Sequence, residues 1–197
     1  MSRRCARLRR ATAVAGLTLS FAATLASAAV EMNIVTNKGF VVFTVADDWL
    51  VTSMQSKLPI AATAFQIPNP ADRGTADSTD LAIVLYDSHS KRARSAFASP
   101  VKQYGSVPPE IKHVAGWKVY RQEALQGSTR YTVLDAKRAG IADVLVTVRL
   151  AWPHLDSNST EYDAAMESIF REFLASIRGE IGPYVPHSQG ATRRPER

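Results

Sequence analysis

The feature that most constrains the fold is one amphipathic segment near the carboxyl end of the chain, residues 162–177. Its apolar residues follow one another at steps of three and one, which places them along one face of an α-helix. They are Tyr162, Ala165, Met166, Ile169, Phe170, Phe173, Leu174 and Ile177. Asp163, Glu167, Arg171 and Glu172 fall on the opposite face. This pattern predicts a helix that packs on a sheet of its own domain.

Both ends of this helix carry sequence signals. Thr160 and Asp163 have the spacing of a capping box at the start. Arg178 places a cation near the last turn, where it interacts favourably with the helix dipole. Gly179 is expected to adopt the left-handed conformation that ends many helices.

A strand directly precedes the helix. Over residues 144–150, valine and leucine alternate with Leu145, Thr147 and Arg149. Alternation with a period of two is typical of a strand that buries one face. We therefore expect this strand and the helix that follows it to bury one another.

The rest of the chain predicts short strands and one further helix. Strands are expected at residues 33–36, 40–45, 50–54, 61–67, 81–86, 116–123, 129–136 and 142–151, with turns at 126–128 and 137–140. A short helix is expected over 88–98, with Ala93, Ala96 and Phe97 on its inner face. The predicted class is α+β: an antiparallel β-sheet flanked by a short helix and a long C-terminal amphipathic helix, as in an α/β/α sandwich.

Residues 1–28 have the order of a secretory signal peptide. Five arginines in the first ten residues precede an apolar stretch, and Ala26-Ser27-Ala28 offers a cleavage site. Cleavage after Ala28 predicts a periplasmic or secreted protein, and an uncleaved membrane anchor stays open as the alternative. Without these arginines the net charge falls from +6 to +1, which gives no support for nucleic-acid binding.

We expect a single domain over residues 29–179 and a disordered tail over 180–197, where apolar residues are few. The only cysteine, Cys5, lies in the expected signal peptide. The mature chain is therefore expected to have no disulfide, no thiolate metal site and no thiol nucleophile.

The order of these elements resembles the PsbP/DcrB-like α/β/α sandwich. The resemblance rests on the strand and corner from Phe40 to Trp49, the meander from Trp117 to Ala136, and the closing helix from Tyr162 to Ile177. Asp47-Asp48 stands where many relatives have proline and glycine. The resemblance implies an exported accessory or partner-binding protein, and it carries over no catalytic residues.

Few residues suggest chemistry. The histidines, His89, His113, His154 and His187, are expected in loops or the tail. His154 and Asp156 have the spacing of half a metal site, but a loop role is the plainer interpretation. Asp47 and Asp48 form an acidic pair that fits a turn better than catalysis. We predict no catalytic residues, no cofactor and no metal.

A small basic cluster is the one candidate for partner binding. Lys91, Arg92 and Arg94 fall on the exposed face of the short helix, and the polar loop 68–80 is expected to contribute to the same surface. The function expected from sequence is an exported, non-catalytic protein that binds a protein partner, without nucleic acid and without a membrane once the signal is cut. A small secreted hydrolase with an acid or metal site is the alternative.

Overall fold

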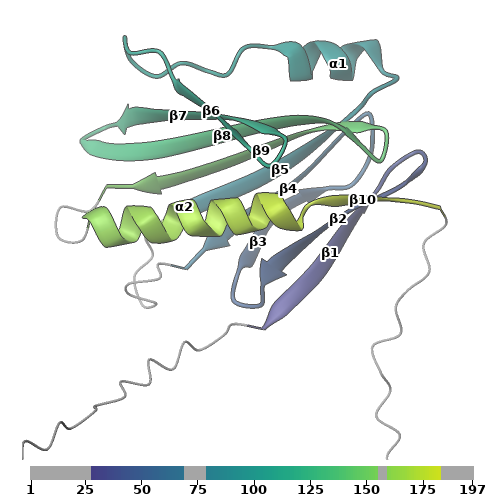
Figure 1. Ribbon diagram of the computed structural model, residues 1–197, viewed down its shortest axis with the longest axis horizontal. Coiled ribbons are helices and arrows are strands. Elements are labelled where there is room, and N and C mark those ends of the chain that lie inside the picture. Colours follow the sequence, from purple (N-terminus) through teal and green to yellow (C-terminus); the bar gives the residue numbers. More distant parts are fainter. Residues whose placement is uncertain (1–27, 69–78, 155–158, 183–197) are drawn as a thin grey trace, which may run out of the picture.

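The computed structural model describes residues 28–68, 79–154 and 159–182, which form two antiparallel sheets and two helices (Figure 1). The elements are β1 (Ala29–Val35), β2 (Gly39–Ala46), β3 (Leu50–Gln55), β4 (Ile60–Ile67), β5 (Thr79–Asp87), α1 (Lys91–Ala98), β6 (Glu110–Val114), β7 (Trp117–Gln126), β8 (Thr129–Ile141), β9 (Val144–Pro153), α2 (Ser159–Ser176) and β10 (Arg178–Ile181). None of the described helices is both long enough and apolar enough to cross a bilayer.

The larger sheet has the order β3-β4-β5-β9-β8-β7-β6, with every neighbouring pair antiparallel. The predicted alternation of β9 is confirmed, because its three valines and Leu150 are buried on one face while Leu145, Thr147 and Arg149 are half-buried on the other. Leu81, Ile83 and Leu85 of β5 lie opposite residues of β9 on the buried face. Strand β5 therefore lies inside the sheet, between β4 and β9.

The smaller sheet has the order β1-β2-β10, with the apolar strand β2 in the middle. The expected left-handed end of the helix at Gly179 is wrong, because Gly179 lies within β10 and pairs with Val41. A Cβ atom at Gly179 would stand 2.6 Å from the backbone nitrogen of Ala142. Glycine is therefore needed here for a close backbone approach. Strand β10 also continues to Ile181, two residues beyond the predicted end of the domain.

Helix α2 and the smaller sheet share one face of the larger sheet. The predicted inner face of α2 is buried, except that Ala165 and Ile169 are half-buried. The ring of Phe43 on β2 meets Phe65 on β4 and Phe173 on α2 edge to face, with centroid separations of 6.2 and 5.6 Å. Because these three aromatic rings come from the smaller sheet, the larger sheet and the helix, they join both sheets and the helix in one core.

On the opposite face of the larger sheet, here called the outer face, the only helix among the described residues is the eight-residue helix α1. In the view of Figure 1, α1 lies above the sheet and α2 below it. Ala93 is fully buried and Phe97 packs against Tyr86, with ring centroids 5.9 Å apart, but Ala96 is exposed, contrary to the prediction. The α+β class with an antiparallel sheet and two helices is thus confirmed. The layering differs from the expected sandwich, because α1 is too short to cover its face and α2 shares the other with a sheet.

Two features of the meander differ from the prediction. Residues 137–140 are not a turn but part of β8, whose register shifts between Ala139 and Ile141. The turn is formed by Ala142 and Asp143, whose φ angles of 45° and 66° are those of a two-residue hairpin. In addition, β6 was not predicted, because its five residues are mostly polar and follow Pro108-Pro109.

Candidate functional site

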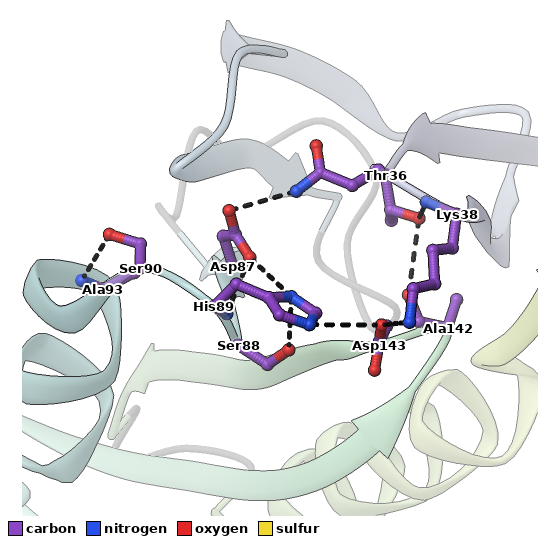
Figure 2. Close-up of polar contacts among 10 residues, drawn as sticks. Thr36, Lys38, Asp87, Ser88, His89, Ser90, Ala93, Ala142 and Asp143 are labelled. Carbon is purple, nitrogen blue, oxygen red and sulfur yellow. Dashed lines mark hydrogen bonds and ion pairs between the residues drawn. The ribbon is translucent and has the colours of Figure 1, made fainter.

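Three turns from distant parts of the chain meet around His89 (Figure 2). Asp87 and Ser88 precede it at the end of β5, Lys38 comes from the turn between β1 and β2, and Asp143 comes from the turn between β8 and β9. His89 Nδ1 lies 3.2 Å from Ser88 Oγ and 3.4 Å from Asp87 Oδ1, while Nε2 lies 3.8 Å from Asp143 Oδ2. This cluster contains serine, histidine and aspartate, so we compared it with a hydrolytic triad.

The geometry of the cluster is not that of a triad. In a triad the serine and the aspartate contact opposite nitrogens of the imidazole, so that one nitrogen accepts the serine proton while the other donates to the carboxylate. Here Ser88 and Asp87 both contact Nδ1, and Asp143, the carboxylate on the Nε2 side, lies 3.8 Å away, which is beyond hydrogen-bond distance. The side chain of His89 is also 60% exposed to solvent. The cluster therefore gives no support to the hydrolase alternative.

The same contacts explain how the chain leaves β5 and enters α1. The backbone N–H of His89 donates to Asp87 Oδ1 at 2.8 Å, and this bond is the main cause that lowers the pKa of Asp87. Asn37 donates to the other carboxylate oxygen at 3.0 Å. Ser90 then caps α1 by accepting from the backbone N–H of Ala93 at 3.3 Å.

The other two histidines that the structure describes, His113 and His154, do not assemble a metal site. His154 Nε2 lies 3.0 Å from Thr132 Oγ1, and its Nδ1 lies 3.8 Å from Asp163 Oδ2. Trp152 donates to the other oxygen of Asp163 at 2.6 Å, so this network fastens α2 to the end of β9. His113 is exposed on β6 and not in a loop. Among the described residues, no group of three or more histidine, cysteine, aspartate or glutamate side chains is placed to hold a metal.

Several predicted positions fall elsewhere. Asp156 and His187 lie outside the described residues, as does most of the loop 68–80. Asp47 and Asp48 form the turn that follows β2, where the backbone N–H of Asp47 donates to the carbonyl of Ala28 at 2.9 Å. The turn role expected for this acidic pair is therefore confirmed.

The predicted basic cluster lies on α1. Lys91, Arg92 and Arg94 are all exposed, and no ion pair joins any of them to an acid within the described part of the chain. Their exposure agrees with the sequence analysis. Their role in binding stays a prediction.

Sequence reasoning missed the more distinctive surface, which is the edge strand β3. All six of its residues are exposed, including Leu50 at 62% and Met54 at 59%. Beyond its ladder with β4, no backbone hydrogen bond involves residues 50–55 in the regions that the structure describes. Its sequence, Leu-Val-Thr-Ser-Met-Gln, contains no charge, whereas β1, β6 and β10, the other edge strands among the described residues, each contain at least one. That lack of charge was the signal available from the sequence.

Comparison with known proteins adds no assignment. No protein-family model matches this chain, and no curated protein matches it either.

Proposed function

We propose that this protein is an exported, non-catalytic binding protein that takes up an extended segment of a partner polypeptide along β3. The observation that carries the proposal is the uncharged edge of the larger sheet, all six of whose residues are exposed. An edge strand presents unpaired N–H and C=O groups, and an extended peptide can satisfy them by adding one more strand. Natural edge strands usually carry charge or proline that prevents such pairing.

The side chains of β3 would give such a partner its specificity. Val51 and Met54 lie opposite Phe65 and Thr63, which are both buried on the core face of the sheet. Val51 and Met54 therefore lie on the same face but are exposed, because they stand outside the core. Leu50 lies opposite Gln66 on the outer face. A partner strand would meet apolar side chains on both faces, which favours an uncharged segment rich in apolar residues.

Two further parts of the proposal concern location and kinship. Cleavage after Ala28 would leave β1 intact, because this strand begins at Ala29. The succession of strands and a closing helix supports kinship with PsbP/DcrB-like α/β/α proteins, many of which are accessory proteins. The intact mass of the protein isolated from its native host tests export. A full-length mass in the membrane fraction would contradict it.

The basic cluster of α1 would contact an acidic region of the same partner. Lys91, Arg92 and Arg94 lie on a helix whose first turn contains no acid. Reversing all three charges to glutamate is expected to weaken binding, and more so at low salt, because exposed charges act over about 10 Å at 0.1 M ionic strength. Equal loss at all salt concentrations would argue against an electrostatic contact.

The decisive experiment uses a peptide selected for binding from a random library, with hydrogen exchange as the readout. On binding, backbone amides of residues 50–55 should become protected. Met54→Lys should abolish this protection, whereas Ile111→Lys on β6, at a residue 52% exposed, is the matched control and should not. Protection elsewhere, or binding that survives Met54→Lys, would refute the proposal. A stable dimer that is lost in Met54→Lys would mean that a second copy occupies this edge.

A further inference from the structure

A second surface, separate from β3, is a polar groove on the outer face with a volume of about 590 Å³. Its floor crosses β5, β9, β8 and β7, and the segment that includes Lys102 and Tyr104 forms one wall. The floor is lined partly by small side chains, Ala82, Ala124 and Ala151, which leave room above the sheet. A volume of this size suits a small organic molecule.

The wall of the groove is held in place by a buried side chain. Gln122 on β7 is only 6% exposed, and its carboxamide makes two hydrogen bonds to the wall. Its Oε1 accepts from the backbone N–H of Tyr104 at 3.1 Å, and its Nε2 donates to the carbonyl of Lys102 at 2.8 Å. Because both bonds go to backbone atoms, the position of the wall is fixed without using the side chains that face the groove.

Two cations gather around one ring in this groove. Arg149 on β9 donates through Nη2 to the hydroxyl of Tyr104, and its guanidinium carbon lies 5.3 Å from the centroid of that ring. Lys102 Nζ lies 4.9 Å from the same centroid. Neither cation forms an ion pair within the described residues. A guanidinium has five N–H donors, so Arg149 retains donors for a ligand.

The nearby acids do not neutralise these cations. Asp135 lies opposite Arg149 in the β8–β9 register but makes no ion pair with it, and burial raises the pKa of Asp135 against the attraction of Arg149. Among the described residues, Asp80 is the only carboxylate that lines the groove, and burial raises its pKa as well. The lining therefore contains two cations against one carboxylate.

We propose that this groove binds a small carboxylate that has an aromatic or apolar body. The carboxylate would take the free donors of Arg149, whose planar fork matches two carboxylate oxygens, with Lys102 as a second cation. The body of the ligand would lie over the small residues of the floor, between Tyr104 and Tyr131. This site requires neither an occupied β3 edge nor any function proposed for it.

The test is a titration of the purified protein with benzoate, phenylacetate and 4-hydroxybenzoate, each beside its neutral amide, with backbone amide NMR shifts as the readout. Each carboxylate ligand should shift the backbone amide signals of residues 102–104 and 149–151. The corresponding neutral amide ligand should not shift them. Arg149→Lys keeps the charge but removes the fork, and it should weaken binding by about tenfold, the factor that corresponds to losing about 1.4 kcal/mol. Lys102→Gln should weaken binding less.

Lys118 supplies the matched control. Its Nζ lies 5.1 Å from the ring centroid of Tyr120 on the same face of the sheet, yet neither residue lines the groove. Lys118→Gln should leave binding unchanged. The proposal is overturned if none of the three carboxylate ligands binds at millimolar concentration, or if their neutral amide analogues bind equally well. It is also overturned if Lys118→Gln weakens ligand binding as much as Lys102→Gln. Inorganic phosphate that displaces the carboxylates would show a general anion site and would also overturn it.

Discussion

The two ends of the larger sheet share one core but differ in their content of charged residues. Strands β3 and β4 contain no charged residue over their combined length. Strands β6, β7 and β8 at the other end contain acids and bases throughout, and the edge strand β6 carries an ion pair between Lys112 Nζ and Glu110 Oε1 at 3.2 Å. Both ends are antiparallel ladders, although the register of β3 against β4 shifts between Val51 and Ser53 whereas that of β6 against β7 is continuous.

This difference teaches which end is open to pairing. A second strand that approached β6 would have to desolvate or accommodate its charges, which disfavours pairing in register with an uncharged segment. A strand that approached β3 would meet no such obstacle. Since Ile111 on β6 and Met54 on β3 are exposed to a similar extent, at 52% and 59%, apolar exposure alone does not distinguish the two edges.

The largest effect is expected at the charged end, where α2 covers β7 and β8. Phe170 is 3% exposed and lines a small cleft together with Val119 and Leu134. Phe170→Ala should lower the free energy of unfolding by about 3–5 kcal/mol, because truncating a buried aromatic leaves a cavity. Urea denaturation measures this loss.

Glu167 is the control on the same helix. Its carboxylate pairs with Arg121 at 3.0 Å, but both side chains are about one third exposed. Glu167→Ala should therefore cost at most about 1 kcal/mol. Equal costs for Phe170→Ala and Glu167→Ala would mean that the buried face of α2 is assigned wrongly.

A change that belongs to neither end should have an intermediate effect. Gly179→Ala would place a methyl group against the backbone of Ala142, and relieving that clash should cost about 1–3 kcal/mol. Thermal unfolding checks the size of the loss. Hydrogen exchange should show that it falls on β10 and β2 and not on β3 or β6. Uniform loss of protection in both sheets would contradict a local role for this glycine.

A smaller, pH-dependent effect is expected inside the charged end. Burial raises the folded-state pKa of Asp135 above its ordinary value of 3.8, so the folded protein binds this proton more tightly than the unfolded chain. Stability from this group is present at low pH and is lost as pH rises above 3.8. Asp135→Asn should therefore stabilise the protein at neutral pH. The gain should vanish in acid, as measured by denaturation across a pH series.

The opposite outcome for Asp135→Asn is equally informative. A variant less stable than the parent at neutral pH would show that attraction to Arg149 outweighs burial.

The smallest effect on stability tests the comparison most directly. Met54→Lys and Ile111→Lys each change an exposed edge residue, so each should alter the free energy of unfolding by no more than about 0.5 kcal/mol. Their effects on pairing should differ, because only the first adds a charge to an uncharged edge. Sedimentation of each variant with and without a β3-binding peptide checks this. Equal effects of the two lysines on peptide binding would erase the distinction between the edges.

Regular periodicity made most of the fold predictable. The stripe of α2 and the alternation of β9 depend on side chains within one element, so the sequence displays them directly. The strand at 61–67 followed from a similar local signal. The prediction that Gly179 ends the helix was wrong because the role of this glycine depends on Ala142, 37 residues earlier in the chain. Strand β10 was not predicted because its four residues have no apolar pattern. Pairing with β2 holds them in place.

The candidate sites were harder to predict because they depend on which strands are neighbours. Lys102 and Arg149 are far apart in the sequence. They meet at the ring of Tyr104 only because the segment that contains Lys102 and Tyr104 passes over β9. The exposure of β3 likewise depends on strand order, since the same six residues in the middle of a sheet would be unremarkable. The basic cluster of α1 was predictable because three cations on one short helix are a local feature.

The smaller sheet has a consequence for the order in which the protein can acquire its structure. Its middle strand, β2, pairs with β1 from the start of the domain and with β10 from its end. A chain that emerges amino end first must therefore keep one side of β2 open until nearly the whole domain has been synthesised. During that interval β2, all but two of whose eight residues are buried in the finished fold, presents an apolar template to any other strand. The four residues of β10 thus close the edge that the growing chain exposes longest.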